Sequence, residues 1–157
     1  MTTWTYNIIE RTIPPTMDRM NFIAAIARAM RYVERVTEER VRFTHRGFLK
    51  PGEVVDAKHH VNIGFDELGD TTKRIGEHNM INGVNSIAFD PNVKWGWNWF
   101  QRVILGRQDL YTIAVHELGH LLGLGHNIRL GERSVMEPFP SVAEFSPGEI
   151  AQLKRTA

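Results

Sequence analysis

The spacing of hydrophobic residues predicts a strand and then a long helix in the first quarter of the chain. Residues 3–11, TWTYNIIER, alternate in polarity and are rich in β-branched and aromatic side chains, as strands are. Pro14 and Pro15 follow and should end this strand. From Asp18 to about Val36, hydrophobic residues recur every three or four positions, which predicts an amphipathic helix.

The remaining pattern predicts more strands, followed by two helices. Strands are expected at residues 40–48 (RVRFTHRGF), 59–66 (HHVNIGFD) and 84–90 (VNSIAFD), with turns at 50–52 and 90–92. A helix should begin near Asp109 and carry LYTIAVHELGHLLG. A last helix should begin at Ser146, where Ser146 and Glu149 can form a capping box. This order predicts an α+β fold with a small sheet, in a single domain spanning residues 1–157.

Composition narrows the functional class only slightly. Hydrophobic residues make up 42% of the 157 residues and charged residues 24%, as in ordinary soluble domains. The net charge of +1 gives no whole-chain indication of nucleic-acid or anionic-membrane binding. No apolar run approaches the roughly 20 residues that span a bilayer, and residues 1–15 lack a signal-peptide pattern. The absence of cysteine excludes disulfides, thiolate zinc sites and cysteine nucleophiles.

The most informative stretch is HELGHLLGLGH, residues 116–126. Positions four apart lie on one face of a helix, so His116 and His120 can share a metal ion. Gly123 can adopt the left-handed conformation that ends a helix, and the turn would bring His126 toward the same point.

This histidine set suits a catalytic rather than a structural zinc ion. Three neutral nitrogens leave the fourth tetrahedral position to water, and zinc lowers the pKa of that water from 15.7 to about 7. Glu117 can lean over the open side of the metal and take the proton from the water. The combination therefore predicts metal-assisted hydrolysis. The alternative, histidines that are only solvated or packed, is disfavoured because chance rarely produces the full pattern.

The motif resembles the zinc signature of the metzincin metalloproteases, and TIAVHELGHLLGLGH is most similar to the matrixins, the matrix metalloproteinase family. The stretch SVMEPFP resembles the Met-turn of that family. The segments WTYNI, VNIGF and FSPGEIAQL also follow matrixin order, so the similarity covers nearly the whole chain. It implies a zincin-like fold: a small twisted mixed sheet, three helices, and a Met-turn between the zinc-site helix and the C-terminal helix.

The resemblance also implies a function and roles for individual residues. The expected activity is that of a zinc-dependent metalloendopeptidase that hydrolyses peptide bonds in proteins. Glu117 would act as general base, and Met136 would form the apolar floor of the site. The zinc ligands would be His116, His120 and His126, and the substrate pocket would involve Val115, Pro138, Phe139 and Pro140. An apolar side chain is expected just after the cut bond.

The chain departs from the matrixin pattern in several places. Asn127 stands where a serine usually follows the third ligand, and Gly148-Glu149 replaces an acidic pair. Without cysteine, a thiolate cannot block the zinc. Residues 64–79 contain no recognisable ligand set for a second, structural zinc, and the sequence does not support a calcium site. The resemblance favours a secreted protein, but the sequence assigns no location.

Two other functions remain open at this level. One is a binding or structural module that keeps the zincin fold without turnover, although such a module has no use for Glu117. The other is a zinc hydrolase that acts on substrates other than peptides. In each case we expect a monomer that binds no nucleic acid and has no membrane-spanning segment.

Two weaker signals have structural alternatives that we favour. His59, His60 and His78 could form a second metal site with Asp66 or Asp70, but no ligand spacing supports it, so solvated positions are expected. Residues 95–99, WGWNW, could form a sugar- or peptide-binding platform. Packing of the three tryptophans is the more common use of such residues.

Overall fold

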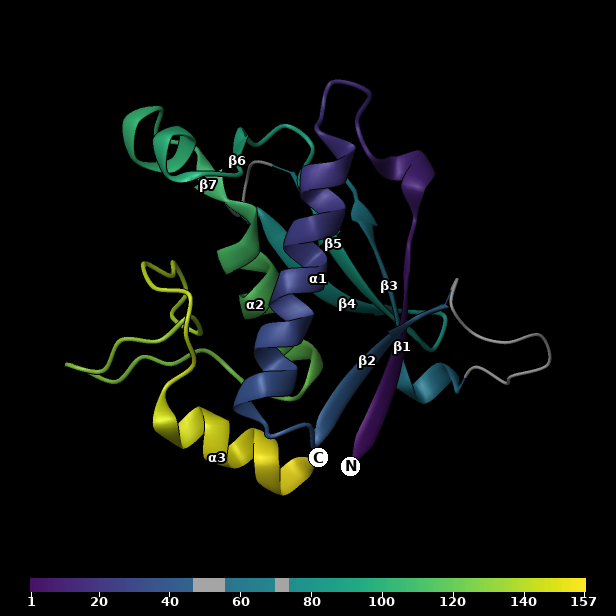
Figure 1. Ribbon diagram of the computed structural model, residues 1–157, viewed down its shortest axis with the longest axis vertical. Helices are drawn as coiled ribbons and strands as arrows, with labels where there is room; N and C mark the ends of the chain where they lie inside the picture. The colour runs from purple at the N-terminus through teal and green to yellow at the C-terminus, as the bar shows by residue number, and fades with distance from the viewer. Residues whose placement is uncertain (47–55, 70–73) are drawn as a thin grey trace.

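A five-stranded sheet carries the fold in the computed structural model, which describes residues 1–46, 56–69 and 74–157 (Figure 1). The spatial order of the strands is β2-β1-β3-β5-β4. Their bounds are β1 Thr2–Ile8, β2 Val41–His45, β3 His60–Phe65, β4 Gly76–Ile81 and β5 Val84–Phe89. The first four in this order run parallel, whereas β4 pairs antiparallel with β5 and forms one edge.

Two helices, α1 (Arg19–Val36) and α2 (Leu110–Leu121), pack together against one face of the sheet (Figure 1). Apolar side chains of α1, α2, β3 and β5 surround the same small internal gap, which shows that both helices share this face. The third helix, α3 (Pro147–Thr156), lies beyond the C-terminal end of α1, near both chain termini (Figure 1). Tyr32 of α1 ties the start of α3 to the core, because its hydroxyl accepts the Phe145 N–H at 2.9 Å.

Shorter elements connect these parts. They are the 3₁₀ turns η1 (Glu10–Thr12) and η3 (Ala57–His59), the π-helix η4 (Phe100–Ile104), and a two-stranded ladder of β6 (Trp95–Gly96) and β7 (Gln108–Asp109). No helix in the described ranges is long and apolar enough to cross a membrane.

The expected α+β class, with a mixed sheet and three α-helices, is confirmed. The first long helix begins as predicted, since the Asp18 side chain accepts the Asn21 N–H at 3.0 Å and caps α1. The first strand is shorter than predicted, because residues 10–12 form η1 instead of continuing it. The turn expected at residues 50–52 lies outside the described residues.

Strand β4 was not predicted, because GEHNMI lacks the alternation of a half-buried strand. Its first three residues are half-buried and its last three are exposed, as an edge strand allows. A signal for it does exist in the turn that follows. Asn82 and Gly83 join β4 to β5 with φ values of 50° and 77°, and Asn-Gly is the preferred pair for such two-residue hairpins.

The three alternating tryptophans do not share one environment. Trp95 is buried, its indole N–H donates to the Asp90 carbonyl at 3.0 Å, and its ring meets Phe89 edge-on. Trp97 is half-buried against the core, so packing is confirmed for these two. Trp99 is 62% exposed, and packing is therefore wrong for that residue.

Candidate metal centre

Helix α2 carries two of the three motif histidines. Its buried apolar side chains, including Leu110, Ala114 and Leu118, fix the helix against the core. His116 is buried and His120 is half-buried, and their ring centroids are 4.6 Å apart. The four-residue spacing therefore places the two imidazoles on one side of the helix, where they meet edge to face.

The end of α2 turns the chain sharply, as the glycine predicts. Gly123 has a φ of 95°, its N–H donates to the His120 carbonyl, and the Leu124 N–H donates to the Gly119 carbonyl at 2.9 Å. These two bonds form a Schellman motif, in which a left-handed residue closes the helix. His126 follows this turn, and its ring centroid lies 5.3 Å from that of His116 and 4.9 Å from that of His120.

The three histidines are thereby brought to one point. One nitrogen from each ring lies within 4.8 Å of the others, and no other group of three or more possible metal ligands forms among the described residues. His116 comes from the interior, whereas His126 is exposed. The cluster consequently opens to solvent on one side.

Two backbone carbonyls determine which nitrogens face the centre. The Nδ1 atoms of His116 and His120 lie 2.6 Å and 2.9 Å from the carbonyl oxygens of Val135 and Leu124. A carbonyl can only accept, so both Nδ1 atoms must carry the proton. Burial lowers the pKa of His116 to about 4, with a smaller opposing effect from the Val135 carbonyl, and burial also lowers the pKa of His120. Both rings are therefore neutral at pH 7, with a lone pair on Nε2.

This tautomer assignment is the reason why the site fits a metal ion. The two Nε2 atoms are 3.0 Å apart, and neither ring has a proton left to place between them. Two facing lone pairs repel each other, whereas a divalent cation attracts both. Neutral imidazoles whose other nitrogen donates to a carbonyl are also the usual zinc ligands in proteins.

Glu117 lies in the same cleft as the histidines and is almost fully buried. Burial raises the pKa of Glu117 to about 7, and the backbone N–H of His78 in β4 donates to the carboxylate and partly offsets this effect. The cleft has a volume of about 720 Å³, and β4 contributes residues 76–78 to its wall. It is further lined by Ile113, Gln108, Pro138, Phe139 and Pro140.

A turn at residues 134–137 packs directly against α2. Val135 supplies the carbonyl that holds His116, and Met136 is fully buried beside Gly119. A methyl group at Gly119 would lie only 2.4 Å from the Met136 sulfur. The glycine of HELGH therefore allows Met136 to pack closely against the helix backbone. The spacing of the motif alone does not predict this contact.

Glu149 of α3 connects three segments around the site. Its carboxylate accepts the Ser146 N–H at 2.8 Å, which completes the predicted capping box. It also accepts the Ser134 hydroxyl at 2.5 Å and the Asn127 side-chain amide at 3.3 Å. Since Asn127 follows the third histidine and Ser134 begins the 134–137 turn, one carboxylate holds both beside the cluster.

The sequence as a whole matches a known family model. Residues 1–152 match the model described as Matrixin. The chain belongs to the matrixin family. Matrixins are metallopeptidases that bind zinc, and the three convergent histidines provide a group in this chain that can hold the metal.

The other predicted site residues fall in different places in this matrixin. Pro138, Phe139 and Pro140 line the cleft, whereas Val115 is fully buried and is not among the residues lining it. His60 is buried, contrary to the solvated position expected, and contacts Thr5 and Asn62. His59 contacts Asp56, and His78 contacts Asn85. Asp70, considered for a second metal site, lies outside the described residues.

We expect Gly119→Ala to lower the free energy of unfolding by about 1–3 kcal/mol, because the added methyl group overpacks the contact with Met136. The displaced turn should also weaken zinc binding, since Val135 holds His116. Denaturant unfolding of the zinc-free protein and zinc titration measure the two effects. Gly148→Ala is the matched control, because nothing lies within 4 Å of its added methyl group. Equal stability of the two variants would contradict the interpretation that Met136 requires a glycine at position 119.

Glu149→Ala should destabilise this matrixin by about 1–3 kcal/mol, because it removes the acceptor for the buried Ser134 hydroxyl and the Ser146 N–H. Gln152→Ala, at an exposed position of the same helix, is the control and should have little effect. Thermal unfolding of both variants provides the test. If the two substitutions cost the same, Glu149 does not organise the surrounding segments.

Proposed function

We propose that this matrixin is a zinc-dependent endopeptidase that cleaves an extended protein segment bound along β4, with Glu117 as the general base. The observation that supports it most is the shared cleft: the three histidines, Glu117 and the edge strand β4 all line one 720 Å³ cavity. All of these residues come from one chain, so the proposal requires no second copy.

His116, His120 and His126 would hold the zinc ion through one nitrogen each. Bound zinc lowers the pKa of a coordinated water and polarises a substrate carbonyl. The chain prepares the site for this by keeping His116 and His120 neutral and oriented through the Val135 and Leu124 carbonyls. Little rearrangement of the rings is then needed when the metal binds.

Glu117 would accept a proton from the attacking water and deliver it to the departing amine. Two features support this role. The carboxylate lines the histidine cleft, and the His78 N–H holds it, so its position relative to the cleft is fixed. A buried carboxylate also exchanges a proton in a less polar environment than water, where electrostatic interactions are stronger.

The substrate would bind by strand addition. Among the described strands, β4 lies at the edge of the sheet and pairs with β5 alone, and an extended peptide can pair with the other side of such an edge strand. Across the cleft, the segment Pro138-Phe139-Pro140 would contact the side chain that follows the cut bond. Phe139 is 79% exposed, and its ring offers apolar surface to a large hydrophobic residue.

The direct test is Glu117→Gln in zinc-loaded protein. The amide keeps the size of the side chain but cannot accept the proton, so cleavage of an unfolded protein should fall about 100-fold to 10,000-fold. Zinc content should stay at one ion per chain by elemental analysis, because the three histidines are unchanged. Proteolysis is followed by gel and by mass spectrometry of the products.

Glu77→Gln is the matched control, since Glu77 also lines the cleft but lies on β4 and pairs with Arg74. It should retain most of the activity. Unchanged cleavage by the Glu117→Gln variant would overturn the assigned role. Failure of the wild type to cut any polypeptide, with hydrolysis of small esters or amides, would instead favour a hydrolase of another substrate class.

A further inference from the structure

The stretch from Trp99 to Leu105, here termed the apolar segment, exposes most of its hydrophobic surface. It contains the π-helix η4. Five of its seven residues are large and hydrophobic, and each is at least half exposed, from 51% for Leu105 to 62% for Trp99: Trp99, Phe100, Val103, Ile104 and Leu105. Soluble proteins rarely leave such a group in water unless it binds something.

The apolar segment is held outward by a defined backbone. The Asn98 side chain accepts the Gln101 N–H at 2.9 Å, and the Gln101 side chain accepts the Trp97 N–H at 2.8 Å. The Arg107 N–H donates to the Gln101 carbonyl at 3.0 Å and closes the loop. The polar groups of Gln101 thus bond to residues that flank the segment, while the apolar side chains of the segment stay exposed.

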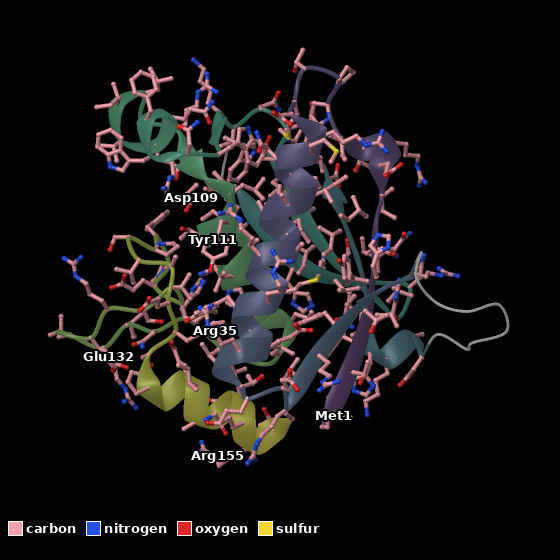
Figure 2. All side chains as sticks on the ribbon, viewed as in Figure 1. Met1, Arg35, Asp109, Tyr111, Glu132 and Arg155 are labelled. Atoms are coloured by element: carbon pink, nitrogen blue, oxygen red, sulfur yellow. The ribbon has the colours of Figure 1, made fainter. Side chains whose placement is uncertain are left out.

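Figure 1 shows this part of the chain projecting from the body beside β6 and β7. In Figure 2, its side chains radiate outward above the labelled Asp109. None of the five hydrophobic residues lines the active-site cleft. The five side chains therefore lie outside the cleft on a projecting part of the chain, here termed the knob, and a partner must surround this projection or yield to it.

The charge around the knob is positive. Residues 91–108 contain Lys94, Arg102 and Arg107 and no aspartate or glutamate. Asp109, the next acidic residue, pairs with Arg102 at 3.2 Å and accepts the Thr112 hydroxyl at 2.8 Å, so the local excess rests on Lys94 and Arg107. The net charge of the whole chain, +1, conceals this local excess.

We propose that the apolar segment docks this matrixin on the surface of an anionic lipid bilayer, without spanning it. Aromatic and aliphatic side chains enter the boundary between headgroups and acyl chains, and the neighbouring cations contact the headgroups. A deformable lipid surface accepts the knob without a matched groove, which favours lipid over a protein partner. This proposal goes beyond peptide hydrolysis and is independent of it.

Docking would also bring the cleft close to the membrane. Gln108 lines the cleft, and its N–H donates to the Lys94 carbonyl at 3.0 Å. Both residues lie at the base of the loop that carries the apolar segment. Proteins held at the bilayer surface would then be the nearest substrates.

The test uses the intact zinc-loaded Glu117→Gln chain, so that binding is measured without cleavage. Sedimentation with phosphatidylcholine vesicles is compared with sedimentation with vesicles that also contain phosphatidylserine. We expect binding to the anionic vesicles that high salt weakens. Val103→Ser combined with Ile104→Ser should weaken it at least about tenfold.

Ile128→Ser combined with Leu130→Ser is the matched control, because both side chains are also highly exposed but lie outside the apolar segment. It should bind vesicles like the parent chain, and circular dichroism should show both double variants folded. The proposal would be overturned if the parent chain bound neither type of vesicle. It would also be overturned if the Val103/Ile104 double variant bound the anionic vesicles as strongly as the parent chain. A dimer in ultracentrifugation that this variant dissociates, without vesicle binding, would assign the knob to self-association instead.

Discussion

Two hydrogen bonds from histidine rings to backbone carbonyls determine what the rest of this site can do. Because the Val135 and Leu124 oxygens can only accept, they place the proton of each ring on Nδ1 and leave two Nε2 lone pairs 3.0 Å apart. That arrangement is unfavourable without a cation and favourable with one. The fold therefore stabilises a site whose chemistry is completed by a metal ion.

The Leu124 carbonyl is held by the local turn that ends α2, whereas the Val135 carbonyl is held by contacts from farther along the chain. The Leu124 N–H closes α2 through the Schellman bond to Gly119, and the Leu124 carbonyl accepts a hydrogen bond from the Nδ1–H of His120. Val135 belongs to the turn that packs Met136 on Gly119, and the Glu149 carboxylate of α3 holds Ser134 at its start. The helix, the turn and α3 thus form one support for the histidines, and β4 contributes the hydrogen bond to Glu117 from the opposite side.

Features that depend on local periodicity could be predicted from the sequence, whereas features that depend on tertiary contacts could not. The spacing of His116 and His120, the turn at Gly123 and the Ser146–Glu149 capping box follow from backbone geometry within a few residues. The polar strand β4 lacks periodicity, and only its Asn-Gly turn marked it. The two further partners of Glu149, the burial of Val115 and the exposure of Trp99 depend on residues far along the chain.

Nitrogen-15 NMR of the histidine rings in zinc-loaded protein tests the central claim most directly, because it reports which ring nitrogen carries the proton and which binds the metal. We expect protonated Nδ1 and zinc-bound Nε2 for both His116 and His120, with one zinc ion per chain. A proton on Nε2 of either ring in the zinc-loaded protein, or zinc bound through Nδ1, would contradict this claim.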